Sequence, residues 1–222
     1  MTNSRTKPDN NASAKDNNRT HVLNEWRRLT LSVNGQPHHF QHHSQRILFA
    51  LQAGLNQFLP GALQDLFIAL GHNGRPLRIR LYTLVLPLLD QHDREYFHEF
   101  LAHDSDRTLN CYRFPGSTLI SDTCHHASTE SDPFIAKTSG SLIEQSRYAI
   151  TYGRVDVAQS SLEQAYSNTT TRPETALVEE LLSLYAATHQ KTRLLQFAHS
   201  LQQHQFTLSN HWKQVLESAK EW

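Results

Sequence analysis

The stretch YAITYGRVDVAQ at residues 148–159 decides the fold, because a related stretch, YAATHQKTRLLQ, follows at residues 185–196. The two begin 37 residues apart (185 minus 148) and share a tyrosine, an alanine, a threonine and a final glutamine. A period in the mid-thirties fits a repeated unit of two packed helices. Gly153 suits the tight turn that such a unit needs. The two stretches therefore predict helical hairpins in which Tyr148 and Tyr185 are equivalent.

The residues around these stretches have the pattern of an all-α domain. Apolar side chains recur at intervals of three and four residues through the C-terminal third, which predicts five helices joined by short polar turns. Ser141 with Glu144, and Thr171 with Glu174, have the spacing of a capping box at a helix start. Because short turns make neighbouring helices antiparallel, we expect residues 141–222 to form a short solenoid of helix pairs, like tetratricopeptide repeats.

The C-terminal third resembles a known group of proteins. Residues 141–222 are similar to the helical repeat region at the cytoplasmic end of FimV-type proteins, which organise type IV pili and secretion machinery at bacterial cell poles. The residues that carry the resemblance are ELLSLYAAT at 180–188, KTRLLQFA at 191–198, Trp212 and Val215. Residues 81–101 resemble the turn and second helix of the same unit more weakly. The sequence departs from the pattern at His189-Gln190, where a glycine usually closes the turn.

The resemblance implies a non-enzymatic cytoplasmic adaptor or scaffold whose partner is another protein, linked to pilus or secretion machinery. Stacked helix pairs form a concave face that holds a segment of the partner. Aromatic residues outside the core would anchor that segment, and the candidates are Tyr152, Tyr166 and Phe206. The alternative interpretation is that these rings pack between the repeats.

The N-terminal region begins with two segments of different character. Residues 1–20 are rich in Asn, Ser and Lys and contain no aromatic residue, so we expect a disordered tail. In residues 28–40, alternate residues are apolar up to Asn34-Gly35, a pair that favours a type I′ turn. This pattern predicts a small β-hairpin, and a helix that starts at Pro37 is the alternative.

The middle of the chain divides into a helical part and an irregular part. Helical stripes of leucine and phenylalanine recur up to residue 103, so we expect a helical domain over residues 22–103. Residues 104–140 are dominated by Ser, Thr and Asp and keep no helical stripe. We expect this segment to be an irregular connector between the two helical domains.

The composition argues against several classes of function. Lys plus Arg and Asp plus Glu number 21 each, so no net positive charge would hold a nucleic acid or an anionic membrane. The first twenty residues lack the apolar segment of a secretory signal. The most apolar run, residues 81–89, is less than half the roughly 20 residues of a spanning helix and contains Pro87. We expect a soluble cytoplasmic protein that does not insert into a membrane.

The stretch QPHHFQHH at residues 36–43 holds four histidines. On a helix, His38 and His42 would lie one turn apart, as would His39 and His43, and this is a spacing at which two histidines bind zinc. Two ligands do not complete a tetrahedral shell, and no carboxylate lies nearby in the sequence. The preferred interpretation is a polar helix start whose imidazoles titrate near neutral pH.

A second set of metal-ligating side chains lies in the irregular segment, at Cys111, Cys124, His125 and His126. Two thiolates and two imidazoles have the ligand types of a zinc site, although neither cysteine belongs to a Cys-x-x-Cys pair. This cluster supports the alternative function, a metal-binding sensor or an enzyme. The sequence contains no complete catalytic set and no phosphate-binding loop, so the favoured interpretation is a protein without enzymatic activity or cofactor.

Overall fold

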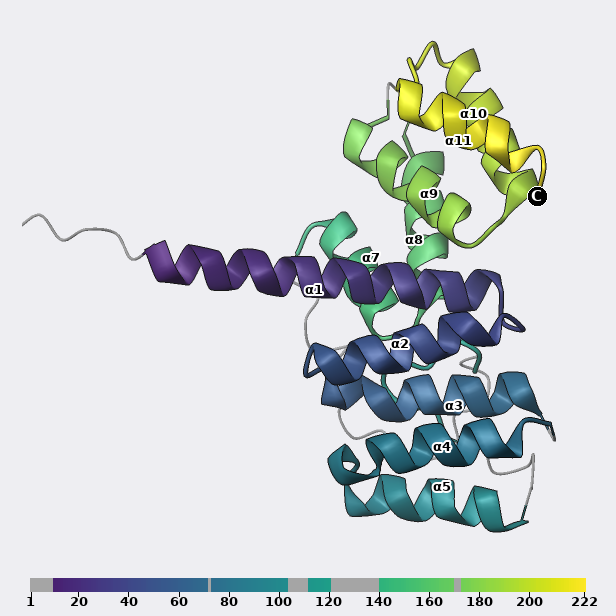
Figure 1. Ribbon diagram of the computed structural model, residues 1–222. Coiled ribbons are helices and arrows are strands. Elements are labelled where there is room, and N and C mark those ends of the chain that lie inside the picture. The colour runs from purple at the N-terminus through teal and green to yellow at the C-terminus, as the bar shows by residue number, and fades with distance from the viewer. Residues whose placement is uncertain (1–9, 72, 104–111, 121–139, 170–172) are drawn as a thin grey trace, which may run out of the picture.

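The computed structural model describes residues 10–71, 73–103, 112–120, 140–169 and 173–222. Every regular element in these ranges is helical, which confirms the all-α prediction (Figure 1). The helices are α1 (Asn10–Gly35), α2 (Phe40–Gln52), α3 (Leu59–Leu70), α4 (Arg75–Val85), α5 (Gln91–His103), α7 (Leu142–Thr151), α8 (Val155–Ser167), α9 (Thr175–Ala187), α10 (Lys191–Gln203) and α11 (Asn210–Ala219), with one-turn 3₁₀ helices η1 (Asn56–Phe58) and η2 (Leu86–Leu88). No helix of the described residues is both long and apolar enough to cross a membrane.

The long helix α1 lies between the two groups of helices. On one side it packs against α2, and α3, α4 and α5 follow as a stack of neighbouring helices (Figure 1). On the other side it packs against α7 and α9, the first helices of two hairpins. Trp26 is fully buried in the core of the N-terminal stack, whereas Leu31 belongs to the core of the C-terminal hairpins. α1 therefore contributes to both cores.

The two-sided burial of α1 explains why the predicted β-hairpin over residues 28–40 is wrong. Leu29, Leu31 and Val33 alternate in the sequence, and all three are buried in α1. A helix enclosed on two sides buries more than one stripe, so its pattern can imitate the alternation of a strand. Residues 36–39 form a turn, and α2 begins at Phe40 rather than at Pro37.

The expected disordered tail is also shorter than the composition predicts. α1 begins at Asn10, so the part of the predicted tail from residue 10 to residue 20 is helical. Polar composition alone did not reveal this, because the helix continues into a segment that both cores hold in place. Residues 1–9 lie outside the described part of the chain.

The C-terminal region contains five helices, α7 to α11, as the periodicity predicts. The capping box at the start of α7 is present, because the Ser141 hydroxyl accepts from the Glu144 amide and the Glu144 carboxylate accepts from the Ser141 amide. Thr171 lies outside the described residues, and α9 has Glu174 as its N-cap residue without a side-chain cap.

The turns of the two hairpins share a backbone pattern, but with a different register from the predicted one. The Arg154 amide donates to the Ala149 carbonyl, and the Gln190 amide donates to the Tyr185 carbonyl, an offset of 36 residues (190 minus 154). Tyr185 is thus equivalent to Ala149, and the expected equivalence with Tyr148 is wrong by one residue. The register is set by the left-handed residue of each turn, Gly153 or His189, and not by the aromatic residues.

Residues 112–120 form no strand and run as an irregular segment between the N-terminal stack and the α7–α8 turn. Phe114 and Ile120 are buried, and the Gly116 amide donates to the Tyr152 carbonyl over 3.1 Å. Glycines allow the close approach on both sides. A Cβ on Gly61 would overlap the backbone around Pro115 and Ser117, and a Cβ on Gly153 would overlap the Ser117 carbonyl.

Candidate partner-binding site

The face that α7 and α9 form together is covered by the chain's own helix α1. The indole nitrogen of Trp26 donates to the Thr151 carbonyl over 2.9 Å, and Arg27 donates through Nε to the Arg147 carbonyl over 3.0 Å. At the other end of α1, a Cβ on Gly35 would lie 2.6 Å from the Thr188 backbone at the end of α9. α1 therefore closes this face of the two hairpins.

Charged side chains lie at the contact of α1 with α7 and α9. Arg147 of α7 and Glu180 of α9 form an ion pair of 2.8 Å, and both lie close to Arg27 of α1. Burial lowers the pKa of Arg27 most, the neighbouring Arg147 lowers it further, and Glu180 opposes both effects. The carboxylate of Glu180 thus offsets the repulsion between two arginines at the junction of three helices.

A shallow depression of about 360 Å³, open to solvent, lies on another face of the hairpins, between α8, α9 and α10, and we call it the cavity. Its lining residues are Glu163, Tyr166, Ser167, Leu181, Tyr185, Arg193, Gln196, Phe197 and Ser200. The Tyr166 ring meets the Phe197 ring edge to face at 4.8 Å between centroids, and its hydroxyl lies 3.1 Å from the Ser200 hydroxyl. The cavity therefore has aromatic walls with polar atoms at their edges.

Glu163 is the polar centre of this cavity. One carboxylate oxygen of Glu163 accepts from the Tyr185 hydroxyl at 2.9 Å, from Arg193 at 2.7 Å and from the side-chain amide of Gln159 at 2.8 Å. Burial raises the pKa of Tyr185 most, and the hydrogen bond to Glu163 raises it further. Tyr185 therefore stays protonated as a donor, and the site can receive an apolar side chain beside a fixed charged pair.

The three predicted anchor residues lie in different surroundings. Phe206 is buried in the core of the C-terminal hairpins. Tyr152 is half-buried at the α7–α8 turn, where its ring packs against Phe58 at 5.3 Å and Tyr148 at 4.6 Å. Both rings pack within the protein, but Tyr152 packs against the N-terminal stack rather than only between the repeats. Tyr166 is half-buried and lines the cavity, so it is the predicted anchor that lies in a concave site.

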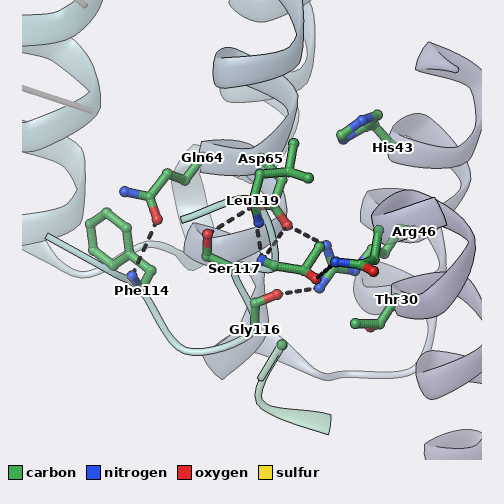
Figure 2. A network of polar contacts seen from close by, with 12 residues as sticks. Thr30, His43, Arg46, Gln64, Asp65, Phe114, Gly116, Ser117 and Leu119 are labelled. Carbon is green, nitrogen blue, oxygen red and sulfur yellow. Dashed lines mark hydrogen bonds and ion pairs between the residues drawn. The ribbon is translucent and has the colours of Figure 1, made fainter. Parts of the chain in front are cut away.

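A buried polar network that the sequence analysis did not identify holds residues 112–120 (Figure 2). Asp65 of α3 pairs with Arg46 of α2 at 2.6 Å, and both side chains are almost fully buried. The Asp65 carboxylate also accepts from the Ser117 hydroxyl at 2.8 Å and from the Thr118 and Leu119 amides.

Arg46 completes the same network. Its second terminal nitrogen donates to the Gly116 carbonyl, and its guanidinium lies 4.5 Å from the centre of the Trp26 ring. Burial lowers the pKa of Arg46, and the charge of Asp65 opposes that effect. Because the two charges are paired, and Asp65 and Arg46 both bond to residues 116–119, we assign the network to fixing residues 112–120 against the stack.

The histidines of residues 36–43 do not converge on one point. The His39 and His42 rings stack at 4.1 Å, whereas His43 turns inward and its Nε2 lies 2.8 Å from the Pro37 carbonyl. Within the ranges that the structure describes, no group of three or more metal-ligating side chains has the geometry of a metal site. Cys111, Cys124, His125 and His126 lie outside those ranges, so the alternative metal cluster stays a prediction.

Comparison of the chain with known proteins finds no matching family model, no matching curated protein and no matching solved structure.

Proposed function

We propose that the protein is a non-enzymatic cytoplasmic adaptor that binds a segment of another protein in the cavity between α8, α9 and α10. The observation that carries this proposal is the position of Tyr166, an anchor predicted from the sequence, in the wall of a cavity of about 360 Å³. Tyrosine is enriched among the residues that dominate binding energy in protein interfaces. The resemblance of residues 141–222 to FimV-type repeats supports a tetratricopeptide-like solenoid and a role beside pilus or secretion machinery.

This cavity is open to solvent, whereas α1 covers the face of α7 and α9. Leu31 of α1 belongs to the core of the C-terminal hairpins, so release of that face would expose a core residue. The cavity instead lies between α8, α9 and α10, and nothing of the described chain has to move for a side chain to enter it.

The lining of the cavity favours one kind of partner residue. The half-buried Tyr166 offers a ring surface and meets the edge of the buried Phe197 ring, whereas the Leu181 side chain is fully buried. An aromatic or branched aliphatic side chain would bury apolar surface there, at roughly 25 cal/mol per Å². Arg193 and Glu163, whose side chains are 53 % and 38 % exposed, would meet polar groups of the partner at the rim.

The test is site-specific photo-crosslinking in the cells that make the protein. A photoreactive phenylalanine at Gln196, which lines the cavity and is exposed, should capture one defined protein, and the captured segment should then bind the purified full chain. Tyr166→Ala should weaken that binding about tenfold or more, as expected for loss of an anchor residue.

The control separates loss of the cavity from loss of the fold. Tyr112→Ala removes a tyrosine that is 41 % exposed and lies beside α5, away from the cavity, and should leave the affinity unchanged. Equal binding by the wild type and Tyr166→Ala, with both folded by circular dichroism, would contradict the proposal.

A further inference from the structure

The turn between α1 and α2 brings the two halves of the molecule together. We call residues 36–43, which are the turn after α1 and the first four residues of α2, the histidine turn, since they include His38, His39, His42 and His43. Gly35, directly before it, contacts the backbone of Thr188 at the end of α9. Thr188 directly precedes the α9–α10 turn, so that turn lies close by. The histidine turn therefore lies next to a contact between the N-terminal stack and the C-terminal hairpins.

His43 is held in its neutral form by its hydrogen bonding. Its side chain is buried, with 1 % of the residue exposed, and Nε2 lies 2.8 Å from the Pro37 carbonyl oxygen. Because a carbonyl oxygen can only accept, Nε2 carries the proton and Nδ1 is the bare nitrogen. Nδ1 is buried and has no hydrogen-bond partner among the described residues. A second proton would therefore sit on a nitrogen without an acceptor, away from water.

The charges around His43 do not compensate for that proton. Arg46 on the same helix repels it, and the Asp65 carboxylate on α3 attracts it, but these two groups are already paired with each other at 2.6 Å. Burial is the largest cause that lowers the pKa of His43, and the hydrogen bond to Pro37 opposes it. The neutral imidazole is the form that fits the fold.

The surroundings of His42 also favour a neutral imidazole. Its ring stacks on His39 with 4.1 Å between centroids, and its Nδ1 is also buried without a hydrogen-bond partner in the described residues. Burial and the neighbouring His39 lower its pKa most, His189 and Arg28 lower it slightly, and a backbone hydrogen bond to Ser32 opposes them. All the charged or titratable neighbours of His42 would carry positive charge at low pH.

We propose that the histidine turn is an acid-responsive joint between the N-terminal stack and the C-terminal hairpins. At neutral pH the imidazoles of His42 and His43 are uncharged and the turn stays closed against the α9–α10 turn. At lower pH, protonation of His43 requires Nδ1 to reach water, so the turn opens and the contact between Gly35 and Thr188 separates. The buried pair of Arg46 and Asp65 keeps the rest of α2 fixed on α3, so the motion is local.

The direction of the pH effect follows from proton linkage. An opened histidine takes up its proton at the ordinary value near 6.5, whereas the closed turn resists protonation. The closed state is therefore fully favoured above about pH 6.5 and loses that advantage as the pH falls below it. One proton of this kind, taken up only by the open form, changes the opening equilibrium by about 25-fold between pH 7 and pH 5.

Amide hydrogen exchange of the full chain at pH 7 and pH 5, corrected for intrinsic exchange rates, tests the joint. Protection in residues 36–43 and 188–191 should fall about 25-fold more than in α4. His43→Gln keeps a donor for the Pro37 carbonyl but cannot titrate, and it should remove this extra loss. His199→Gln, a matched change at an exposed position of α10, should retain it.

Two results would overturn the proposal. One is equal protection of the histidine turn at both pH values, and the other is a loss that persists in His43→Gln. If that variant does not fold, NMR titration of His43 in the wild type decides instead. A midpoint below 6.5 supports the joint, and a midpoint at or above 6.5 overturns it.

Discussion

The turns of the two C-terminal hairpins share a backbone conformation, but one turn is buried and the other is exposed. Gly153 in the α7–α8 turn and His189 in the α9–α10 turn both take a positive φ, +83° and +53°. Gly153 is buried against the Ser117 carbonyl, whereas the His189 side chain is exposed and its ring lies 4.6 Å from the Trp222 ring. The comparison shows that the first turn requires glycine because of a tertiary contact, and the second accepts a side chain because its surroundings are open.

The difference extends to what each turn connects. The α7–α8 turn receives residues 112–120, since the Gly116 amide donates to the Tyr152 carbonyl and Arg113 donates to the Gly153 carbonyl at 2.9 Å. The α9–α10 turn instead meets the end of α1 at Gly35. The first turn therefore depends on a buried polar network, and the second on the packing of a helix end.

We expect the largest loss of stability from disrupting the buried polar network of Arg46 and Asp65, which supports the α7–α8 turn and not the α9–α10 turn. Asp65→Asn leaves Arg46 buried without its counter-charge, and we expect the free energy of unfolding to fall by about 3–5 kcal/mol. Urea denaturation measures it. Glu217→Gln, which removes an exposed ion pair with Lys220, should change stability by less than about 0.5 kcal/mol. Equal effects of the two variants would refute the assigned role of the network.

The next effect tests the glycine of the first turn directly. Gly153→Ala forces a Cβ into the Ser117 carbonyl at a positive φ, and we expect a loss of about 3 kcal/mol in urea denaturation. Gly54→Ala is the matched control, because Gly54 has a φ of +68° and an added Cβ there would meet nothing within 4 Å. That variant should lose only about 1 kcal/mol. Similar losses would show that φ alone, and not the contact, requires glycine.

A smaller effect concerns Asp93, beside the other end of residues 112–120. Burial first and the neighbouring Asp90 second raise the pKa of Asp93 to about 6. The folded protein therefore binds this proton more tightly than the unfolded chain, and stability falls as the pH rises from about 4 to about 6. Since Asp93 is partly exposed, we expect Asp93→Asn to stabilise the protein at pH 8 by only about 1 kcal/mol.

The readout for Asp93 is the urea midpoint measured from pH 4 to pH 8. Asp156→Asn, an exposed carboxylate in the first turn of α8, serves as control and should leave the pH profile of the wild type unchanged. A profile of Asp93→Asn that coincides with that of the wild type would contradict the assignment.

The smallest effect sharpens the comparison at the second turn. His189→Gly relieves a left-handed conformation that costs a side chain about 1–2 kcal/mol, but it adds entropy to the unfolded chain. It also removes the ring contact with Trp222. We expect a net gain of about 0.5 kcal/mol by thermal and urea denaturation. A loss of 1 kcal/mol or more would mean that the His189 ring supports the turn.

The sequence by itself determined the local structure of the C-terminal third. Helical periodicity, the capping box of Ser141 and Glu144, and Gly153 at a turn each act within a few residues, so they can be recognised without knowledge of the fold. Tyr166 was likewise identified as a candidate anchor, although its position in a cavity depends on α9 and α10.

The tertiary structure decided the rest, because the causes lie far apart in the chain. The alternation of Leu29, Leu31 and Val33 is typical of a strand. It is explained only by the position of α1 between two cores, which buries all three residues in a helix. Asp65 interacts with Arg46, which is 19 residues away in the sequence, and with Ser117, which is 52 residues away. No local sequence pattern indicates that such residues interact. α1 also covers the face of α7 and α9 through contacts between segments that are distant in the sequence. Such packing, and not local helix propensity, determines which surfaces of the protein remain exposed.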